Sequence, residues 1–313
     1  MRPPASRAHA APAAAGTPDS ALALTLLIGL AFAVIWSSAF SVAKVLVSDI
    51  PPYTVSALRF ATAAVLAGAI AAALGQRLPR GREAWGPILV LGTCQNTLYL
   101  GAFFNAMTMI PAGLAAIIAS AMPLVVAALA PAVLAERIGR VRAFGLALGF
   151  GGVVWIMGAR VAGGVEPFGV AIALAGTLGL AVATLTVKRG DFGTGLMMVV
   201  ACQMAVGAIG CAVLALLLED IDAWTLTPGN RAILAAAFAY QVVLPGIVAT
   251  LLWFTLVRRV SAAGASTFHF LNPVFGVAFA WALLGEAVGW SDALGVVLVA
   301  AGILIVNRAR QPA

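Results

Sequence analysis

Two stretches of this chain decide its fold because they repeat each other: residues 112–142 read AGLAAIIASAMPLVVAALAPAVLAERIGRVR, and residues 262–292 read AAGASTFHFLNPVFGVAFAWALLGEAVGWSD. At a fixed offset of 150 residues, Pro123 aligns with Pro273 and Glu136 aligns with Glu286. Three glycines follow the same offset, namely Gly139, Gly145 and Gly152, which match Gly289, Gly295 and Gly302. A proline, glutamate and glycine series at one offset indicates an internal repeat.

The composition places this repeat in a membrane. Of the 313 residues, 63% are hydrophobic and 9% are charged, and the mean hydropathy is +1.07. A soluble protein needs more charge than this to cover its surface, whereas bilayer hydrocarbon tolerates such a chain. The net charge of +7 comes from residues that punctuate apolar runs. They form no basic stripe, so nucleic acid is not an expected partner.

Ten segments are long and apolar enough to span a bilayer, which takes about 20 residues of helix. The expected protein is therefore an all-α membrane protein with ten transmembrane helices. Residues 1–20, rich in Ala and Pro, are expected to form a disordered cytoplasmic tail, followed by a first repeat over 21–160 and a second over 165–308. The ten segments cover residues 22–46, 52–74, 86–105, 112–135, 142–160, 168–188, 195–218, 232–256, 263–284 and 290–307.

The two repeats are expected to have opposite orientations. Each repeat holds five helices, an odd number, so the second copy starts on the other side of the membrane. The charges agree: residues 136–142 read ERIGRVR, while the equivalent residues 286–292 read EAVGWSD and have no arginine. With both termini in the cytoplasm, 14 of the 18 Lys and Arg residues fall on the cytoplasmic side and two fall in outer loops. Inverted repeats are typical of alternating-access transporters.

Several motifs resemble the EamA-type transporters of the drug/metabolite transporter superfamily, over nearly the whole chain after residue 20. They include WSSAFSVAK at 36–44, LRF at 58–60, LWF at 252–254, NPVF at 272–275 and LGE at 284–286. Part of this order of motifs occurs in both halves of the chain. The resemblance implies two five-helix EamA repeats. It also implies export of amino acids or related metabolites, with some members of the family acting on drugs or other solutes.

Polar side chains inside the spans are the candidate substrate-binding or gating residues, because such groups are costly in hydrocarbon. His269 and Asn272 are three apart and share a helix face, and Pro273 leaves the carbonyl of His269 without its helical N–H partner. A packing kink is the alternative, since Pro123 repeats the proline. The further polar candidates are Gln95, Asn96 and Tyr99 in the third segment, and Tyr240 and Gln241 in the eighth.

Two basic residues fall within spans. Arg59 lies about two turns inside the second segment, where it either binds a substrate carboxylate or makes a structural contact. Lys44 lies near the outer end of the first segment and either binds substrate or extends its amine to the interface. Trp36 and Trp253 are candidate cavity-lining residues, with lipid or core packing as the alternative.

Pro123, Pro273, Glu136 and Glu286 are expected to be structural elements of the repeat, with the two carboxylates held by a local cation or by loop amides. All eleven Asp and Glu residues lie in loops, in the tail or at span ends. A carboxylate-built ion site deep in the bundle is therefore not expected. The spacing of the three cysteines fits no metal site, and no phosphate-binding loop occurs, so neither a metal nor a cofactor is expected.

The sequence thus predicts a secondary transporter of the bacterial inner membrane that exports an amino acid or related small polar metabolite. A multidrug or organic-solute efflux carrier and a channel-like permease stay open as alternatives. No catalytic constellation is present, so the chain is not expected to be an enzyme. The expected partners are a small-molecule substrate and the lipid bilayer, and a homodimer stays open.

Overall fold

The computed structural model describes residues 18–134, 139–189, 192–220, 228–260, 265 and 267–308, and this part of the chain is helical throughout, without strands. Helix α1 begins at Pro18, so the last three residues of the expected tail are helical. The rest of that tail and Glu136 lie outside the described residues.

The helices follow the predicted segments, but several segments are divided. The first repeat contains α1 (Pro18–Val47), α2 (Pro52–Ala73), α3 (Arg82–Leu91), the π-helix η1 (Gly92–Gly101), α4 (Ala102–Met109), α5 (Ala112–Ala119), α6 (Met122–Leu134) and α7 (Arg140–Ala162). The second contains α8 (Pro167–Arg189), α9 (Leu196–Leu218), the 3₁₀ turn η2 (Pro228–Asn230), α10 (Arg231–Gln241), the π-helix η3 (Val242–Ala249), α11 (Thr250–Arg259), the 3₁₀ turn η4 (Thr267–Leu271), α13 (Asn272–Leu284) and α14 (Trp290–Arg308).

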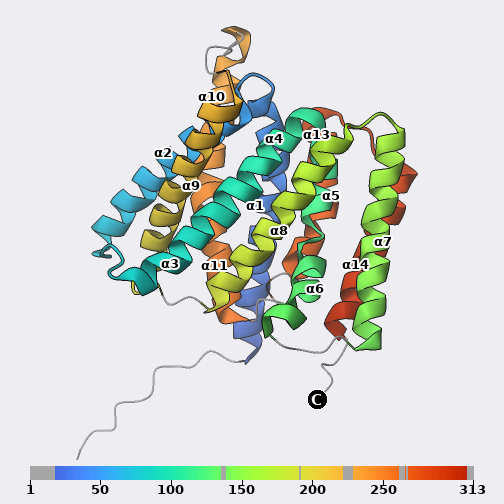
Figure 1. The fold of residues 1–313 in the computed structure, drawn as a ribbon, viewed down its shortest axis with the longest axis horizontal. Coiled ribbons are helices and arrows are strands. Elements are labelled where there is room, and N and C mark those ends of the chain that lie inside the picture. The colour runs from blue at the N-terminus through green and yellow to red at the C-terminus, as the bar shows by residue number, and fades with distance from the viewer. Residues whose placement is uncertain are drawn as a thin grey trace, which may run out of the picture.

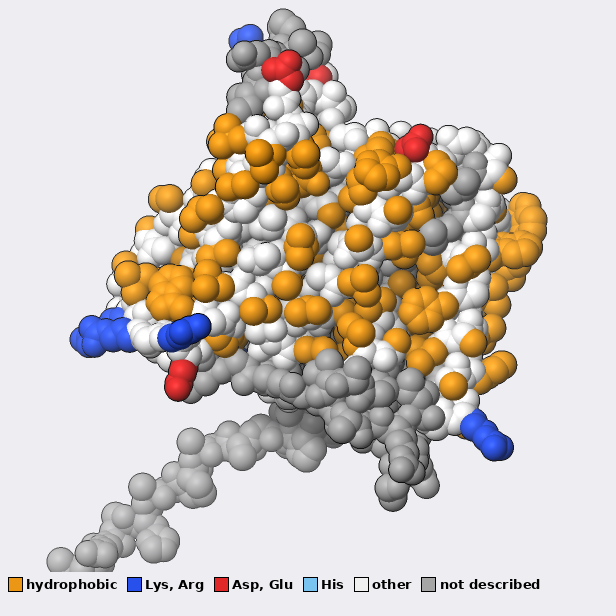
Figure 2. Space-filling view, in the orientation of Figure 1, with side chains coloured by type: hydrophobic (Ala, Val, Ile, Leu, Met, Phe, Trp, Pro, Cys, Tyr) orange, Lys and Arg blue, Asp and Glu red, His pale blue; other side chains and the backbone are white. Residues whose placement is uncertain are grey.

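In the part of the chain that the structure describes, six helices are long and apolar enough to cross a membrane, and four shorter apolar helices occupy the other four predicted positions. The six long spans are Leu22–Val47, Pro52–Ala73, Arg82–Met109, Pro167–Val187, Leu196–Leu218 and Arg231–Arg259. In the space-filling view of Figure 2, hydrophobic side chains cover the middle of the face, and the charged side chains lie at its two ends. This surface fits a multi-pass membrane protein.

Two pairs of equivalent helices, α2 with α9 and α7 with α14, pack against each other and run antiparallel. In the α7–α14 pair, Gly145 lies against Gly302 while Gly152 lies against Gly295, so the residue numbers rise along one helix as they fall along the other. The start of α1 and the end of α14 lie at the same end of the molecule (Figure 1). Opposite directions in equivalent helices are what an inverted repeat requires.

The two π-helices mark equivalent points of the repeats, because Gly92 at the start of η1 and Val242 at the start of η3 are 150 residues apart. Pro245 lies inside η3. Wide π turns are rare and occur often at functional sites. The sequence analysis treated both segments as ordinary helix, and periodicity over a few residues does not separate a π turn from an α turn.

The α2–α9 pair is joined at both ends by a side chain that caps the partner helix. Glu219, after α9, accepts hydrogen bonds from the backbone N–H groups of Tyr53 and Thr54 and from the Thr54 hydroxyl. At the opposite end, the Gln76 carbonyl oxygen accepts a 3.0 Å hydrogen bond from the Met198 N–H at the start of α9. A carboxylate at a helix N-terminus is stabilised by unpaired amides and by the helix dipole.

Replacing Glu219 with alanine is expected to lower the thermal stability of the protein. Three donors at the start of α2 would lose their acceptor, and a hydrogen bond to a charged group contributes about 1.5–3 kcal/mol. Thermal unfolding of the purified protein in detergent measures the effect. Glu83→Ala is the matched control, because Glu83 is exposed on α3. Equal melting temperatures for the two variants would contradict the capping role.

The repeated prolines begin helices instead of kinking them. The predicted span 263–284 is divided into η4 and α13, and Pro273 lies in the first turn of α13. His269 therefore lies in η4, directly before α13 begins, and the segment around Pro273 changes from a 3₁₀ turn to an α-helix. Proline suits a first helical turn because no N–H partner is needed there. Pro123 likewise follows Met122, the first residue of α6.

Glu286 joins the repeats at the start of α5. Its carboxylate accepts hydrogen bonds of 2.7 and 2.9 Å from the N–H groups of Ala112 and Gly113. The carboxylate thus lies at a helix N-terminus of the opposite repeat, as Glu219 does at α2. Backbone amides of the other repeat hold it, and its own helix α13 ends with Gly285 in the left-handed conformation, at φ 67°.

Candidate functional site

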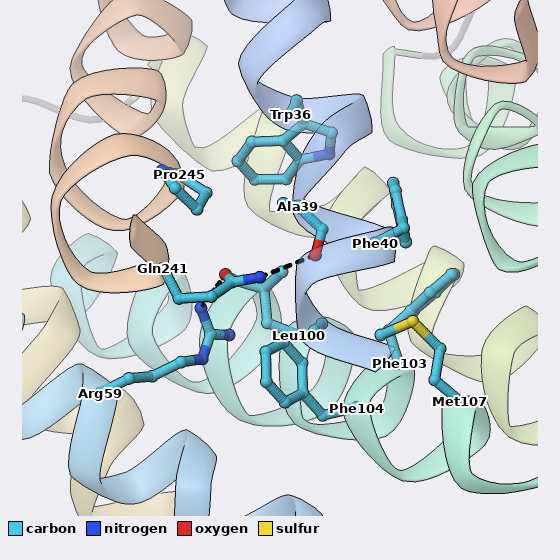
Figure 3. Close-up of a pocket in the computed structure, with 11 residues that line it drawn as sticks. Trp36, Ala39, Phe40, Arg59, Leu100, Phe103, Phe104, Met107, Gln241 and Pro245 are labelled. Carbon is cyan, nitrogen blue, oxygen red and sulfur yellow. Dashed lines mark hydrogen bonds between the residues drawn. The ribbon is translucent and has the colours of Figure 1, made fainter. Parts of the chain in front are cut away.

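A small pocket lies between the two repeats. Helix α1 forms one wall, α2 contributes a single arginine, and η1 with α4 forms the opposite wall. Gln241 and Pro245 close it from the second repeat (Figure 3). The lining residues are Trp36, Ala39, Phe40, Ala43, Arg59, Leu100, Phe103, Phe104, Met107, Gln241 and Pro245.

Arg59 is the charged group of this pocket. Its side chain is only 2% exposed, and the centre of its guanidinium lies 4.1 Å from the ring centroid of Phe60 and 4.2 Å from that of Phe104. Nη1 donates to the Gln241 carbonyl oxygen at 3.5 Å. Among the described residues, neither Nε nor Nη2 has a hydrogen-bond partner, and no carboxylate pairs with the guanidinium.

The orientation of Gln241 is determined by α1. Its amide nitrogen donates a 2.7 Å hydrogen bond to the Ala39 carbonyl, so its carbonyl oxygen faces Arg59. Gln241 is the last residue of α10, where the π-helix η3 begins. This contact therefore connects the second repeat to α1 and α2 of the first repeat at the pocket itself.

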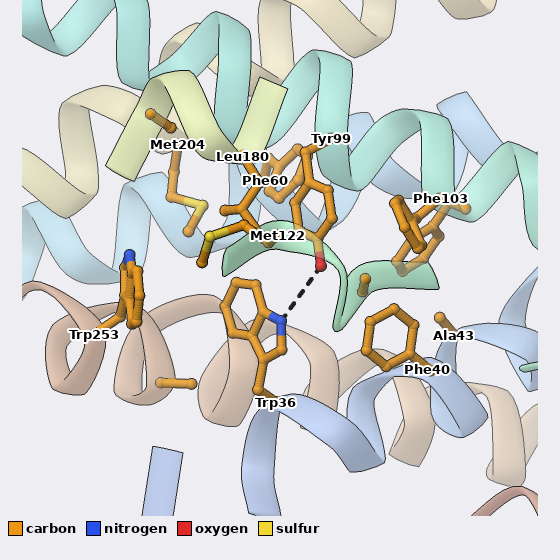
Figure 4. Close-up of a cluster of buried hydrophobic side chains, with 14 of the residues drawn as sticks. Trp36, Phe40, Ala43, Phe60, Tyr99, Phe103, Met122, Leu180, Met204 and Trp253 are labelled. Atoms are coloured by element: carbon orange, nitrogen blue, oxygen red, sulfur yellow. Dashed lines mark hydrogen bonds between the residues drawn. The ribbon is translucent and has the colours of Figure 1, made fainter. Parts of the chain in front are cut away.

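Trp36 separates the pocket from a larger buried aromatic cluster (Figure 4). Its ring lies parallel to that of Tyr99, with an interplanar angle of 2° and 6.2 Å between centroids, and its Nε1 donates to the Tyr99 hydroxyl at 3.4 Å. Trp253 lies deeper in the cluster and stacks on Phe32. Trp36 thus belongs both to the pocket lining and to the packed core beside it.

A hydrogen-bonded network of Ser37, Asn272 and His269 begins on α1 at the residue after Trp36. The Ser37 hydroxyl donates to the Asn272 carbonyl oxygen at 3.0 Å, and the Asn272 amide nitrogen lies 2.9 Å from Nδ1 of His269. Because the amide nitrogen can only donate, Nδ1 accepts and the proton of a neutral imidazole lies on Nε2. The ring of His269 makes edge contacts with Phe32, Trp36 and Trp253. This network ties η4 and α13 to α1.

The other predicted residues make structural contacts. Lys44 donates to the carbonyl oxygens of Met107 and Ile110 at the end of α4, where a cation suits the helix dipole. Asn96 donates to the Gln203 carbonyl at 2.9 Å and joins η1 to α9. Tyr240 and the Ser38 hydroxyl form a hydrogen bond between α10 and α1.

Gln95 is fully buried, and its amide atoms have no partner among the described residues. Gln95 and Tyr99 are four residues apart in η1, where π turns replace the α-helical spacing that would place such residues on one face.

The structure therefore brings Trp36, Arg59 and Gln241 together in one pocket, with Tyr99 behind Trp36. Sequence reasoning missed the three phenylalanines of the pocket, Phe40, Phe103 and Phe104, and also Ser37. An aromatic residue in a span carries no signal of its own that separates pocket lining from core. Phe104 and the intramembrane Arg59 come close only after the chain folds, so their proximity could not be seen in the sequence.

The arrangement is suited to binding and offers no group of residues for covalent chemistry. Within the described ranges, no three His, Cys, Asp or Glu side chains come together to hold a metal ion.

The EamA-like transporter family matches this sequence twice, over residues 23–158 and 167–308. The chain belongs to the EamA-like transporter family. The two matched ranges coincide with the two repeats deduced from the sequence, so each repeat is one EamA unit. Membership in a transporter family also agrees with the absence of a catalytic motif from the sequence.

Similar EamA-like proteins span most of this chain. An uncharacterized transporter of Synechocystis is 25% identical over 299 residues, covering 88% of each chain. The uncharacterized inner membrane transporter YedA of Escherichia coli K12 is 25% identical over 298 residues, covering 92% of this chain and 93% of its own length. A solved crystal structure with 21% identity matches the fold with a TM-score of 0.64 over 90% of this chain and 96% of the other.

Proposed function

We propose that this EamA-like protein is a ten-helix secondary transporter of the bacterial inner membrane that exports an amino acid or a related small polar metabolite. The observation that carries the proposal is the pocket around Arg59, which is buried among spanning helices and lined by both repeats. Substrate pockets of transporters built from repeats lie at the repeat interface. The four shorter apolar helices complete the ten crossings in this proposal.

Alternating access is the proposed mechanism. Two repeats of opposite direction have two related packings of similar energy, each open to one side of the membrane. Glu219 and Glu286 hold helix N-termini of the first repeat, and both lie on the side assigned to the outside. Opening toward that side requires these contacts to move, while Gln241 keeps its place beside the substrate.

The proposed orientation has both termini in the cytoplasm. It is supported by the bias of Lys and Arg toward one side of the predicted topology and by the common end at which α1 begins and α14 ends (Figure 1). Cysteine labelling from outside intact spheroplasts tests it. A cysteine at Gly229, in the long loop after α9, should react, and a cysteine at Gly81, between α2 and α3, should not.

Metabolite profiling tests the export itself. The protein is induced in a bacterial host, and the medium is analysed by mass spectrometry beside an uninduced culture and an Arg59→Ala strain. Selective accumulation of one amino acid or related compound, lost in Arg59→Ala, supports the proposal. An unchanged medium contradicts metabolite export.

Asn272→Ala is expected to reduce export strongly while the protein still inserts. The substitution removes both the Ser37 contact and the His269 contact, so α13 would lose its polar connection to α1. Loss of two buried hydrogen bonds costs about 1–3 kcal/mol, which is small against the packing of a spanning bundle. Export rate normalised to membrane-inserted protein measures the effect. Export at the wild-type rate would remove this network from the site.

Efflux of a larger organic solute is the second candidate function. Apart from Arg59 and Gln241, the pocket is lined by apolar side chains, which suits an apolar body. Tolerance to a panel of toxic compounds distinguishes this function: expression should raise the tolerated concentration of several unrelated compounds if the protein is a multidrug carrier.

A further inference from the structure

Arg59 presents an unusual combination of burial and missing partners. A buried charge is normally paired, because removing it from water without compensation is costly. Here the guanidinium is 2% exposed, and its described contacts are two aromatic rings and one neutral amide oxygen. Aromatic rings attract a cation but carry no countercharge.

The positions of the two guanidinium nitrogens without partners indicate which chemical group would bind them. Nη1 is engaged by Gln241, while Nε and Nη2 have no partner within the described part of the chain. Nε and Nη2 lie on the same edge of a guanidinium and present two parallel N–H groups. A carboxylate matches this edge with its two oxygens in a bidentate pair.

We propose that the pocket takes an organic monocarboxylate with an apolar body, bound through Nε and Nη2 of Arg59, in preference to a zwitterionic amino acid. This inference rests on the proposed transport function and selects, among its candidate substrates, a carboxylate that carries no ammonium group. Trp36, Phe40, Phe103 and Phe104 line the same pocket and provide the apolar contact (Figure 3).

The preference over an amino acid follows from charge. A zwitterion brings an ammonium group into the pocket together with its carboxylate. No Asp or Glu lines the pocket, and the Gln241 carbonyl oxygen already faces Arg59. An ammonium group in this pocket would leave water without a carboxylate partner, whereas a monocarboxylate neutralises the one charge already there.

Three probes with the same skeleton test the proposal: 3-phenylpropionate (anion), phenylalanine (zwitterion) and phenethylamine (cation). Binding to the purified wild-type protein in nanodiscs is measured by calorimetry. The expected order places 3-phenylpropionate at least about tenfold tighter than phenylalanine, with the amine weakest. Equal or tighter binding of phenylalanine, or no binding of 3-phenylpropionate, would overturn the proposal. This series needs no variant, so it stands even if a variant fails to fold.

Variants of Arg59 then test the contact. Arg59→Gln should weaken 3-phenylpropionate binding at least about tenfold and reduce its advantage over the amine, while Arg59→Lys retains the charge without the bidentate edge and should be intermediate. Arg80→Gln, at an exposed arginine before α3, should leave binding unchanged. Unchanged affinity in Arg59→Gln would overturn the assignment.

Counterflow in proteoliposomes separates this inference from the transport function. Carboxylate-selective binding that depends on Arg59, without counterflow of any probe, would refute transport and leave the anion site standing. Counterflow of phenylalanine that is unaffected by Arg59→Gln would refute the anion site and leave transport standing. Counterflow of 3-phenylpropionate that is lost in Arg59→Gln supports both.

Discussion

Gly302→Val is expected to lower the stability of the protein more than any other single substitution considered, because it forces α7 and α14 apart. A Cβ at Gly302 would lie 2.4 Å from the backbone nitrogen of Gly149 and 2.6 Å from the carbonyl oxygen of Gly145. These are backbone atoms of the partner helix, which cannot change rotamer to make room. Overpacking of this kind costs about 1–3 kcal/mol, and sometimes more.

The measurement is thermal unfolding of the purified protein in detergent, followed by size-exclusion chromatography for aggregation. Gly151→Val is the matched control, because a Cβ at Gly151 of α7 would meet no atom within 4 Å. Both substitutions place a β-branched residue in an apolar helix, so their intrinsic helix propensities cancel. Similar melting temperatures for the two variants would show that the α7–α14 seam tolerates separation. Small residues at such seams normally allow membrane helices to approach closely.

Arg59→Gln is expected to raise the stability of the ligand-free protein and to abolish most of its transport. The guanidinium is buried without a described carboxylate partner, so its removal relieves an uncompensated charge. A buried charge without a partner costs free energy, so its replacement by a neutral amide is expected to raise the melting temperature. The same substitution removes the proposed anchor of the substrate. Stability and function should therefore change in opposite directions.

Melting temperature without ligand and transport rate per inserted protein are measured on the same preparations. The matched control is Arg80→Gln, which removes an exposed arginine and should alter neither quantity by much. A purely structural role for Arg59 predicts the opposite sign of the stability change, because the Gln241 and Phe104 contacts would be lost without any gain. A lower melting temperature in Arg59→Gln would thus support the structural alternative.

Sequence alone was sufficient for the membrane class, the internal repeat and the family. These properties depend on composition and on residue order, which folding does not alter. The offset of 150 residues matched Pro123 to Pro273, whereas only the structure shows that these prolines lie at the starts of α6 and α13 and that π-helices begin at Gly92 and Val242. The opposite directions of the repeats followed from an odd number of helices and from the placement of arginines.

The roles of individual polar residues required the tertiary structure. Arg59 and Lys44 were both candidate substrate-binding cations in the sequence, yet Lys44 binds the carbonyl groups at the end of α4 and Arg59 lines the pocket. In the sequence, Glu219 was one acidic residue among those of the loops. Only the structure shows that its carboxylate binds backbone N–H groups at the start of α2. The helical period predicts which residues share a face, but it does not predict which other helices that face contacts.

The sequence by itself determined that this is a repeated, multi-spanning helical protein of the EamA type, because hydrophobic length and repeat order are local or linear properties. Only the tertiary structure decided that Trp36, Arg59 and Gln241 form one pocket. Those residues are separated by up to 205 positions and belong to three helices, α1, α2 and α10. Their meeting depends on how α1, α2 and α10 pack, and packing depends on all the side chains between them at once.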